Sequence, residues 1–221
     1  MFTFVLGSAG ALAQPKDKEK EKDREKEPAK PPAPPAPTSL MTGRVTFKLP
    51  KEWVVQRPVK QGIADGYQLG VPGKEFEGTK HTANAAIIAE EQELLVSASD
   101  FSEWKLKRFT GERLGAVDEG PNWRTVLSKD LVDGTTYIIV DRFGVKGKLV
   151  AYLRLAFPIV KNNATWERKL VSDYNTMMKS WEIEGDSNVR CELVRDEGKF
   201  RLEETKEASP DRRPKPRRRA K

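Results

Sequence analysis

The sequence predicts an α+β fold built on an antiparallel β-sheet, and three observations support this. Two stretches suited to strands, residues 123–132 and 135–143, flank an Asp-Gly pair at residues 133–134. This pair is typical of type I′ hairpin turns, which require positive φ at both positions. A third stretch, residues 149–157, places apolar side chains on one face and extends the hairpin to a three-stranded meander. An apolar stripe along residues 165–181 predicts an amphipathic helix that covers the sheet.

Short strands are expected before the meander. Residues 44–50 alternate apolar and polar side chains, as a half-buried strand does, and a proline ends the alternation. Residues 53–55 and 67–69 are short strand candidates between glycines and prolines, and residues 84–90 form a more apolar one. The predicted order is short strands, then a helix, then the meander.

The helix between these two groups of strands is predicted over residues 99–113. Asp100 is a suitable N-cap, and Glu103 three residues later completes a capping-box pattern. Gly115 stands just past the expected end of the helix. Its apolar contacts are expected from three aromatic residues, Phe101, Trp104 and Phe109.

The helix at residues 165–181 has Thr165 as its expected N-cap. Its apolar residues recur at spacings of four, four, three and four, which aligns them on one stripe. They are Trp166, Leu170, Tyr174, Met177 and Trp181. Charged residues such as Glu167 fall elsewhere on the helix and are expected to face water. A stripe of this kind can also contact a partner or a lipid surface, but a helix that covers its own sheet is commoner, and we expect this packing.

The N-terminal region is interpreted as an export signal followed by a stalk. Residues 2–12 are apolar and small, and an Ala-Leu-Ala sequence ending at residue 13 fits the cleavage pattern of a signal peptide. No basic residue precedes the apolar run, so the signal is expected to be truncated or degenerate. Residues 14–39 alternate in charge and then become proline-rich, which predicts a disordered spacer. The expected location is therefore extracytoplasmic, either periplasmic or secreted.

The excess positive charge of the chain lies near the C-terminus. The chain has a net charge of +7, yet residues 40–205 hold 25 charged residues of each sign, and residues 206–221 hold eight basic and two acidic ones. A basic groove for nucleic acid would leave excess charge on the fold, so no specific nucleic-acid binding is expected. The tail is instead a candidate segment for anionic envelope polymers or membrane surfaces, with a merely solubilising tail as the alternative. Its candidate site residues are Arg212, Arg213, Lys215, Arg217, Arg218, Arg219 and Lys221.

One cysteine and one histidine limit the chemistry that the chain supports. Cys191 alone excludes a disulfide framework and cysteine-rich metal sites, and His81 alone excludes a multi-histidine metal site. Residues 185–205 are expected to form a short hairpin around Glu197-Gly198, with Cys191 among its few apolar residues. We expect a buried or inert thiol, the alternative being a cross-link between two chains. No metal and no cofactor are expected.

The sequence contains no recognisable catalytic motif. There is no nucleophile elbow to accompany His81, no Walker loop and no dinucleotide fingerprint. Two acidic groups could pair as acid and base or hold Ca²⁺, although no ligand spacing supports either role. They are Glu90, Glu91 and Glu93, and Asp130, Asp133 and Asp141. Asn163-Ala164-Thr165 matches a glycosylation acceptor, but the capping role of Thr165 explains it without a sugar.

Four features together resemble the PsbP-like superfamily. They are the opening VTFKLPKEW at residues 45–53, the hairpin at residues 133–134, the strand ending Ala-Phe-Pro at residue 158 and the helix ending Ser180-Trp181. This superfamily includes the extrinsic photosystem II protein PsbP, a Ran-release factor and exported bacterial domains. The resemblance covers about residues 42–184 and implies an α/β/α sandwich, a central antiparallel sheet flanked by helices. The chain has Trp181 where the family more often has Phe.

The sequence thus predicts an exported, non-enzymatic binding or accessory domain, with another protein or an anionic surface as its partner. The predicted organisation is a signal peptide (1–13), a stalk (14–39), a globular domain (40–184), a short hairpin or extension (185–205) and a disordered basic tail (206–221). Two alternatives stay open: a small hydrolase with an unrecognised carboxylate site, and a polyanion-binding protein that acts through its tail. A binding domain predicts a groove without converging titratable groups, whereas a hydrolase predicts buried, paired carboxylates.

Overall fold

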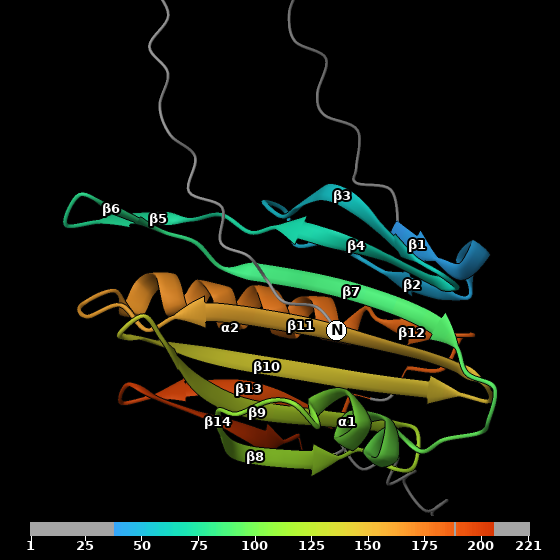
Figure 1. Ribbon diagram of the computed structural model, residues 1–221. Coiled ribbons are helices and arrows are strands. Elements are labelled where there is room, and N and C mark those ends of the chain that lie inside the picture. Colours follow the sequence, from blue (N-terminus) through green and yellow to red (C-terminus); the bar gives the residue numbers. More distant parts are fainter. Residues whose placement is uncertain (1–37, 188, 206–221) are drawn as a thin grey trace, which may run out of the picture. The chain divides into compact units, whose positions relative to one another are not determined.

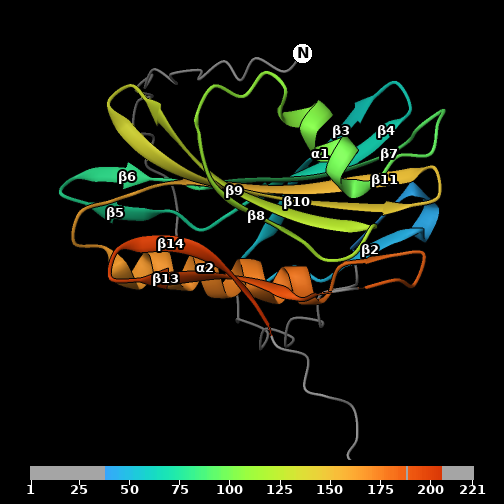
Figure 2. The same ribbon diagram turned by 90° about the horizontal axis from the view of Figure 1, so that it is seen from below.

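The computed structural model describes residues 38–187 and 189–205 and is centred on a seven-stranded antiparallel sheet (Figure 1). The strand order is β3-β4-β7-β11-β10-β9-β8. The strands are β3 (Val54–Gln61), β4 (Ala64–Gly70), β7 (Asn84–Glu91), β8 (Glu112–Asp118), β9 (Trp123–Val132), β10 (Thr135–Lys146) and β11 (Leu149–Pro158). Helix α1 (Ala98–Leu106) lies on one face of this sheet, and helix α2 (Ala164–Lys179) lies on the other (Figure 2). The predicted α+β class with a helix-flanked antiparallel sheet is confirmed.

Smaller strand pairings accompany the central sheet. A three-stranded sheet has the order β1-β2-β12, and two hairpins are formed by β5 with β6 and by β13 with β14. The elements are β1 (Thr38–Leu40), the 3₁₀ helix η1 (Met41–Gly43), β2 (Val45–Phe47), β5 (Lys74–Phe76), β6 (Thr79–His81), β12 (Glu182–Ile183), β13 (Cys191–Asp196) and β14 (Lys199–Glu204). The β13–β14 hairpin, predicted around Glu197-Gly198, is confirmed and lies beside α2 (Figure 2).

The meander forms as its turn signal predicts. Asp133 and Gly134 have φ of 49° and 77°, and the strands on either side pair from Thr135↔Val132 to Gly144↔Trp123. β11 pairs with β10 on one side and with β7 on the other, which joins the meander to the earlier strands. A two-residue turn between Lys146 and Leu149 sets the β10–β11 register.

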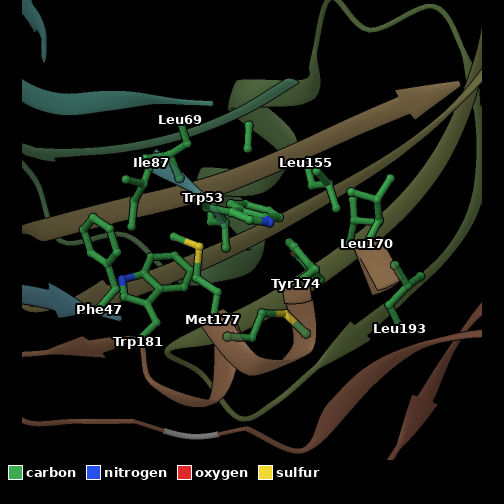
Figure 3. Close-up of a cluster of buried hydrophobic side chains, with 14 of the residues drawn as sticks. Phe47, Trp53, Leu69, Ile87, Leu155, Leu170, Tyr174, Met177, Trp181 and Leu193 are labelled. Atoms are coloured by element: carbon green, nitrogen blue, oxygen red, sulfur yellow. The ribbon is translucent and has the colours of Figure 1, made fainter. Parts of the chain in front are cut away.

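The main hydrophobic core lies between α2 and the central sheet (Figure 3). The predicted apolar stripe is buried there, including Trp181 just past the end of α2, and so is one face of β11. Trp181 is 1% exposed and packs edge to face on Trp123, with ring centroids 5.2 Å apart. Leu193 and Phe200 of the β13–β14 hairpin belong to the same core. Among the described residues, no helix has both the length and the apolar character needed to cross a membrane.

Helix α1 is shorter than predicted, and its cap is different. It ends at Leu106 instead of residue 113, because residues 112–118 pair with β9 as strand β8, and Gly115 lies within that strand. The N-cap is Ser97, whose hydroxyl accepts a hydrogen bond from the Asp100 backbone N–H at 3.0 Å. The predicted Asp100 cap was therefore wrong by three residues.

Two details of α2 also differ from the prediction. Its N-cap position is Asn163, so Thr165 lies inside the first turn and does not cap the helix. Glu167 was expected to face water but is buried, and its carboxylate accepts a hydrogen bond from the Arg195 guanidinium of β13. One sequence-predicted surface position is thus an anchor between α2 and the C-terminal hairpin.

Candidate functional site

Three carboxylates are buried inside the fold, and each lies against an arginine. The pairs are Glu119 with Arg142, Asp141 with Arg154, and Glu167 with Arg195. A buried carboxylate that stays ionised needs such a partner, because burial alone favours its neutral form. Each of these buried carboxylates is thus held by an arginine.

Glu119 is the centre of a clamp that connects three segments. Its carboxylate accepts hydrogen bonds from Arg142 of β10, from the Thr125 hydroxyl of β9 at 3.1 Å, and from the Arg190 backbone N–H. The Arg142 guanidinium also lies 4.8 Å from the centroid of the Trp123 ring. Arg190 directly precedes β13, so this clamp fixes the C-terminal hairpin to the sheet.

Asp141 and Arg154 form a bidentate pair across two neighbouring strands. Arg154 Nε and Nη2 lie 2.6 and 3.0 Å from the two Asp141 oxygens. The residues are direct partners in the β10–β11 register. Desolvation opposes the charged form of Arg154, but the interaction with Asp141 outweighs it and the pKa of Arg154 is raised. Tyr152 lies next to this pair, and burial raises the pKa of its hydroxyl because it disfavours the charged form.

The acidic residues named from the sequence do not form a shared site. Glu90 binds Lys105 at 3.0 Å, Glu91 binds Arg44, and Asp133 occupies the hairpin turn. Glu93 is exposed, and an Asp130 oxygen accepts a hydrogen bond from the next backbone N–H. Across residues 38–187 and 189–205, no three potential metal ligands of the His, Cys, Asp or Glu type come together.

The single histidine and the single cysteine of the sequence lie on different strands. His81 ends the short strand β6, where it was expected in a loop. Cys191 begins β13 and is buried, which agrees with the expected inert thiol. Burial, followed by the charge of Glu119, raises the pKa of its thiol to about 12.

A polar groove of about 340 Å³ runs between α2 and β13. Its lining includes the Asn175 amide, which holds the backbone of Leu193 through two hydrogen bonds of 2.9 and 3.0 Å. Its one acidic residue, Glu192, is bound by Lys179 at 2.6 Å. The lining thus holds one ion pair, and among the described residues Glu192 has no second carboxylate beside it in the groove.

A second surface lies on the opposite face of the sheet, around α1. Trp104 is 60% exposed on this helix, and Leu94 and Leu95 are exposed in the segment that leads into it. We call Leu94, Leu95 and Trp104 the α1 surface. The Trp104 ring packs against the buried Phe101. The two rings are stacked, with centroids 6.1 Å apart and an interplanar angle of 24°. Sequence reasoning placed Trp104 among the core contacts of the helix and so missed this exposed aromatic.

The candidate residues of the basic tail lie outside the described residues, so their role stays a prediction.

One signal in the sequence could have revealed the Asp141–Arg154 pair. Asp141 and Arg154 interrupt two apolar strands, and a two-residue turn after Lys146 fixes a register in which they face each other.

Comparisons with known proteins find similar solved structures only. No model of a known protein family matches the sequence, and no curated protein matches it. The Ran-binding protein Mog1p of Saccharomyces cerevisiae aligns with a TM-score of 0.46 and 15% identity, over 67% of this chain and 95% of Mog1p. A mutant of Mog1 aligns with a TM-score of 0.45 and 15% identity, again over 67% of this chain and 95% of the other. A protein of Bacteroides thetaiotaomicron aligns with a TM-score of 0.40 and 18% identity, over 69% of this chain and 51% of the other. The PsbP-like resemblance stays a prediction.

Proposed function

We propose that this chain is a non-catalytic binding domain that docks another protein on the α1 surface. The observation that carries the proposal is Trp104, a large aromatic that is 60% exposed on a short, well-packed helix. Tryptophan is enriched among the residues that dominate protein interfaces, since it buries a large rigid surface on binding. The two exposed leucines before α1 add apolar area near the same helix.

The state of the buried carboxylates supports a binding role over hydrolysis. A carboxylate that acts as a general acid near neutral pH needs a raised pKa, which a neighbouring carboxylate or an apolar pocket supplies. Glu119, Asp141 and Glu167 each have an arginine against them instead. In these arrangements the carboxylates hold segments of the chain together.

Site-directed photo-cross-linking tests the docking surface. The full chain carries p-benzoylphenylalanine in place of Lys107, which is exposed at the end of α1, three residues after Trp104. A matched chain carries it in place of Lys80, which is exposed on β6. In the organism that encodes the chain, we expect a discrete cross-linked protein from position 107 and none from position 80.

Competition shows whether the cross-link depends on Trp104. An excess of purified wild-type chain should suppress it, whereas the Trp104→Ala chain should not, because the aromatic anchor is gone. Equal competition by the two chains, or the same products from both positions, would refute the α1 surface as the docking site.

Export of the domain is the second part of the proposal. It rests on the Ala-Leu-Ala sequence that ends at residue 13 and on the charged, proline-rich segment after it. The chain, expressed with its upstream codons in a host that has a secretion pathway, should appear outside the cytoplasm with Gln14 as its first residue. A cytoplasmic protein that keeps Met1 would contradict export.

A further inference from the structure

The ammonium group of Lys105 lies in a cage of three aromatic rings. Its Nζ atom is 4.8 Å from the ring centroid of Trp104, 5.2 Å from that of Tyr152 and 5.4 Å from that of Phe101. Glu90 closes the cage, with Oε1 3.0 Å from Nζ. The aromatic faces carry negative potential and the carboxylate carries a charge, so all four groups favour a cation at this point.

The cage is built from three separate elements that are held in place. Phe101, Trp104 and Lys105 come from α1, Tyr152 comes from β11 and Glu90 comes from β7. Tyr152 stacks on Phe143 at 6.0 Å, and Phe143 in turn meets Phe101 edge to face at 5.8 Å. A further hydrogen bond from Gln92 Nε2 to Glu90, at 3.1 Å, orients the carboxylate. Phe101, Tyr152 and Glu90 therefore have supports other than Lys105, and Trp104 stacks on Phe101.

Lys105 is an occupant that can leave. Its side chain is 24% exposed, and one wall of the cage is the exposed Trp104. Lysine has a long flexible side chain whose ordering costs entropy, so a displaced Lys105 regains conformational freedom in water. A cation from outside can thus compete with Lys105 for the cage.

The carboxylate selects the kind of cation. Glu90 Oε1 lies 3.0 Å from the Lys105 ammonium nitrogen, close enough for a primary ammonium to donate a hydrogen bond, which a quaternary ammonium cannot do. Trp104 belongs both to the cage and to the α1 surface. A lysine side chain on the docked protein would therefore satisfy the site better than a choline-like group.

We propose that Phe101, Trp104, Tyr152 and Glu90 form a primary-ammonium site that Lys105 occupies in the unbound domain and that a lysine side chain of the partner protein takes over on docking. The proposal rests on the function proposed above. It makes Lys105 a competitor of the partner. Loss of the Lys105 charge should strengthen binding at the cage, whereas loss of the Glu90 charge should weaken it.

The test uses n-butylammonium as a mimic of the lysine side chain, with tetramethylammonium and 1-butanol as controls. Binding to the full chain is followed through the indole N–H resonance of Trp104, which the Trp104→Phe chain identifies. The Lys105→Met chain has a side chain of similar length and helix propensity, but it lacks the ammonium charge that occupies the cage. Circular dichroism verifies that the variants fold.

We expect n-butylammonium to bind Lys105→Met saturably and at least about ten-fold more tightly than the wild type, in which Lys105 competes. Tetramethylammonium should bind more weakly and 1-butanol should give no saturation. Combining Lys105→Met with Glu90→Gln should abolish the preference for the primary ammonium.

Two results would overturn the assignment: equal affinity of the wild type and Lys105→Met for n-butylammonium, or no saturable shift in either chain. These results leave the cross-link from position 107 unaffected, so failure of the cage is distinguishable from failure of the docking surface. Conversely, saturable binding to Lys105→Met without a cross-link would support the cage and contradict the docking surface.

Discussion

At the scale of single residues, the five tryptophans of the chain fall into two groups. Four of them, Trp53, Trp123, Trp166 and Trp181, are buried in the main core, and Trp104 is exposed. The apolar spacing of the last helix predicted burial for two of them, because α2 is long enough to define a stripe. It could not predict Trp104, since α1 is short and only tertiary contacts decide which of its sides meets the sheet.

Trp181→Ala and Trp104→Ala form a matched pair of tryptophan deletions. Trp181 is 1% exposed, so its removal leaves a cavity and should lower the free energy of unfolding by about 3 to 5 kcal/mol. Trp104→Ala should cost less than about 1 kcal/mol, because most of that ring already faces water. Urea denaturation followed by circular dichroism measures both. Equal losses would show that α2 does not cover the sheet as described.

Cys191 gives the stability of the fold a dependence on pH in the alkaline range. Its pKa is raised from 9.0 to about 12 in the folded chain, chiefly by burial. The unfolded chain loses the thiol proton first as the pH rises, so the stabilisation is complete below about pH 9 and is lost progressively toward pH 12. Between about pH 8 and about pH 10, the free energy of unfolding should therefore fall more in the wild type than in Cys191→Ala. Parallel pH curves would contradict a buried thiol.

At the scale of elements, turns were easier to predict than helix ends. The hairpins at Asp133-Gly134 and Glu197-Gly198 formed where expected, because positive φ at two adjacent residues is a local requirement. The end of α1 was wrong because the pairing of β8 with β9 takes over the residues that would have continued the helix. Strand pairing at this distance has no local signal in residues 107–113. The arginine partners of Glu119 and Glu167 were missed for the same reason.

Asn175 is the element-scale contact that we expect to hold β13 against α2. Its amide satisfies both the N–H and the C=O of Leu193, whose side chain is buried in the main core. Asn175→Ala should lower the free energy of unfolding by about 1 to 3 kcal/mol, the cost of leaving backbone groups unpaired. Thr176→Ala, one residue along and exposed, should change it by less than about 0.5 kcal/mol. Hydrogen exchange at the Leu193 amide should accelerate only in Asn175→Ala.

At the scale of the whole molecule, the balance of charge separates the domain from the tail. Residues 40–205 are electrically neutral overall, and the net charge of +6 in residues 206–221 is a property of sequence alone. The distribution of charge therefore predicts a division between domain and tail, which stays a prediction, whereas the α1 surface required the fold. Polyanion binding through the tail stays an alternative role alongside protein docking.

Removal of residues 206–221 tests that alternative. The full chain should bind heparin with an affinity that falls steeply between about 50 and 200 mM salt, because each neutralised charge releases counterions. The truncated chain should lose this binding and keep the thermal unfolding transition of the intact one. Retention of the same salt slope after truncation would move the anion site into residues 40–205.

The affinity of the partner captured at position 107 for three matched chains tests the central claim most directly. Isothermal titration with wild type, Trp104→Phe and Trp104→Ala isolates the aromatic anchor, since Phe keeps a ring that can stack on Phe101. We predict a Kd at least about ten-fold higher for Trp104→Ala and an intermediate value for Trp104→Phe, as for an interface residue that dominates binding. A Kd that changes less than about two-fold in Trp104→Ala, with the chain folded, would contradict docking on the α1 surface.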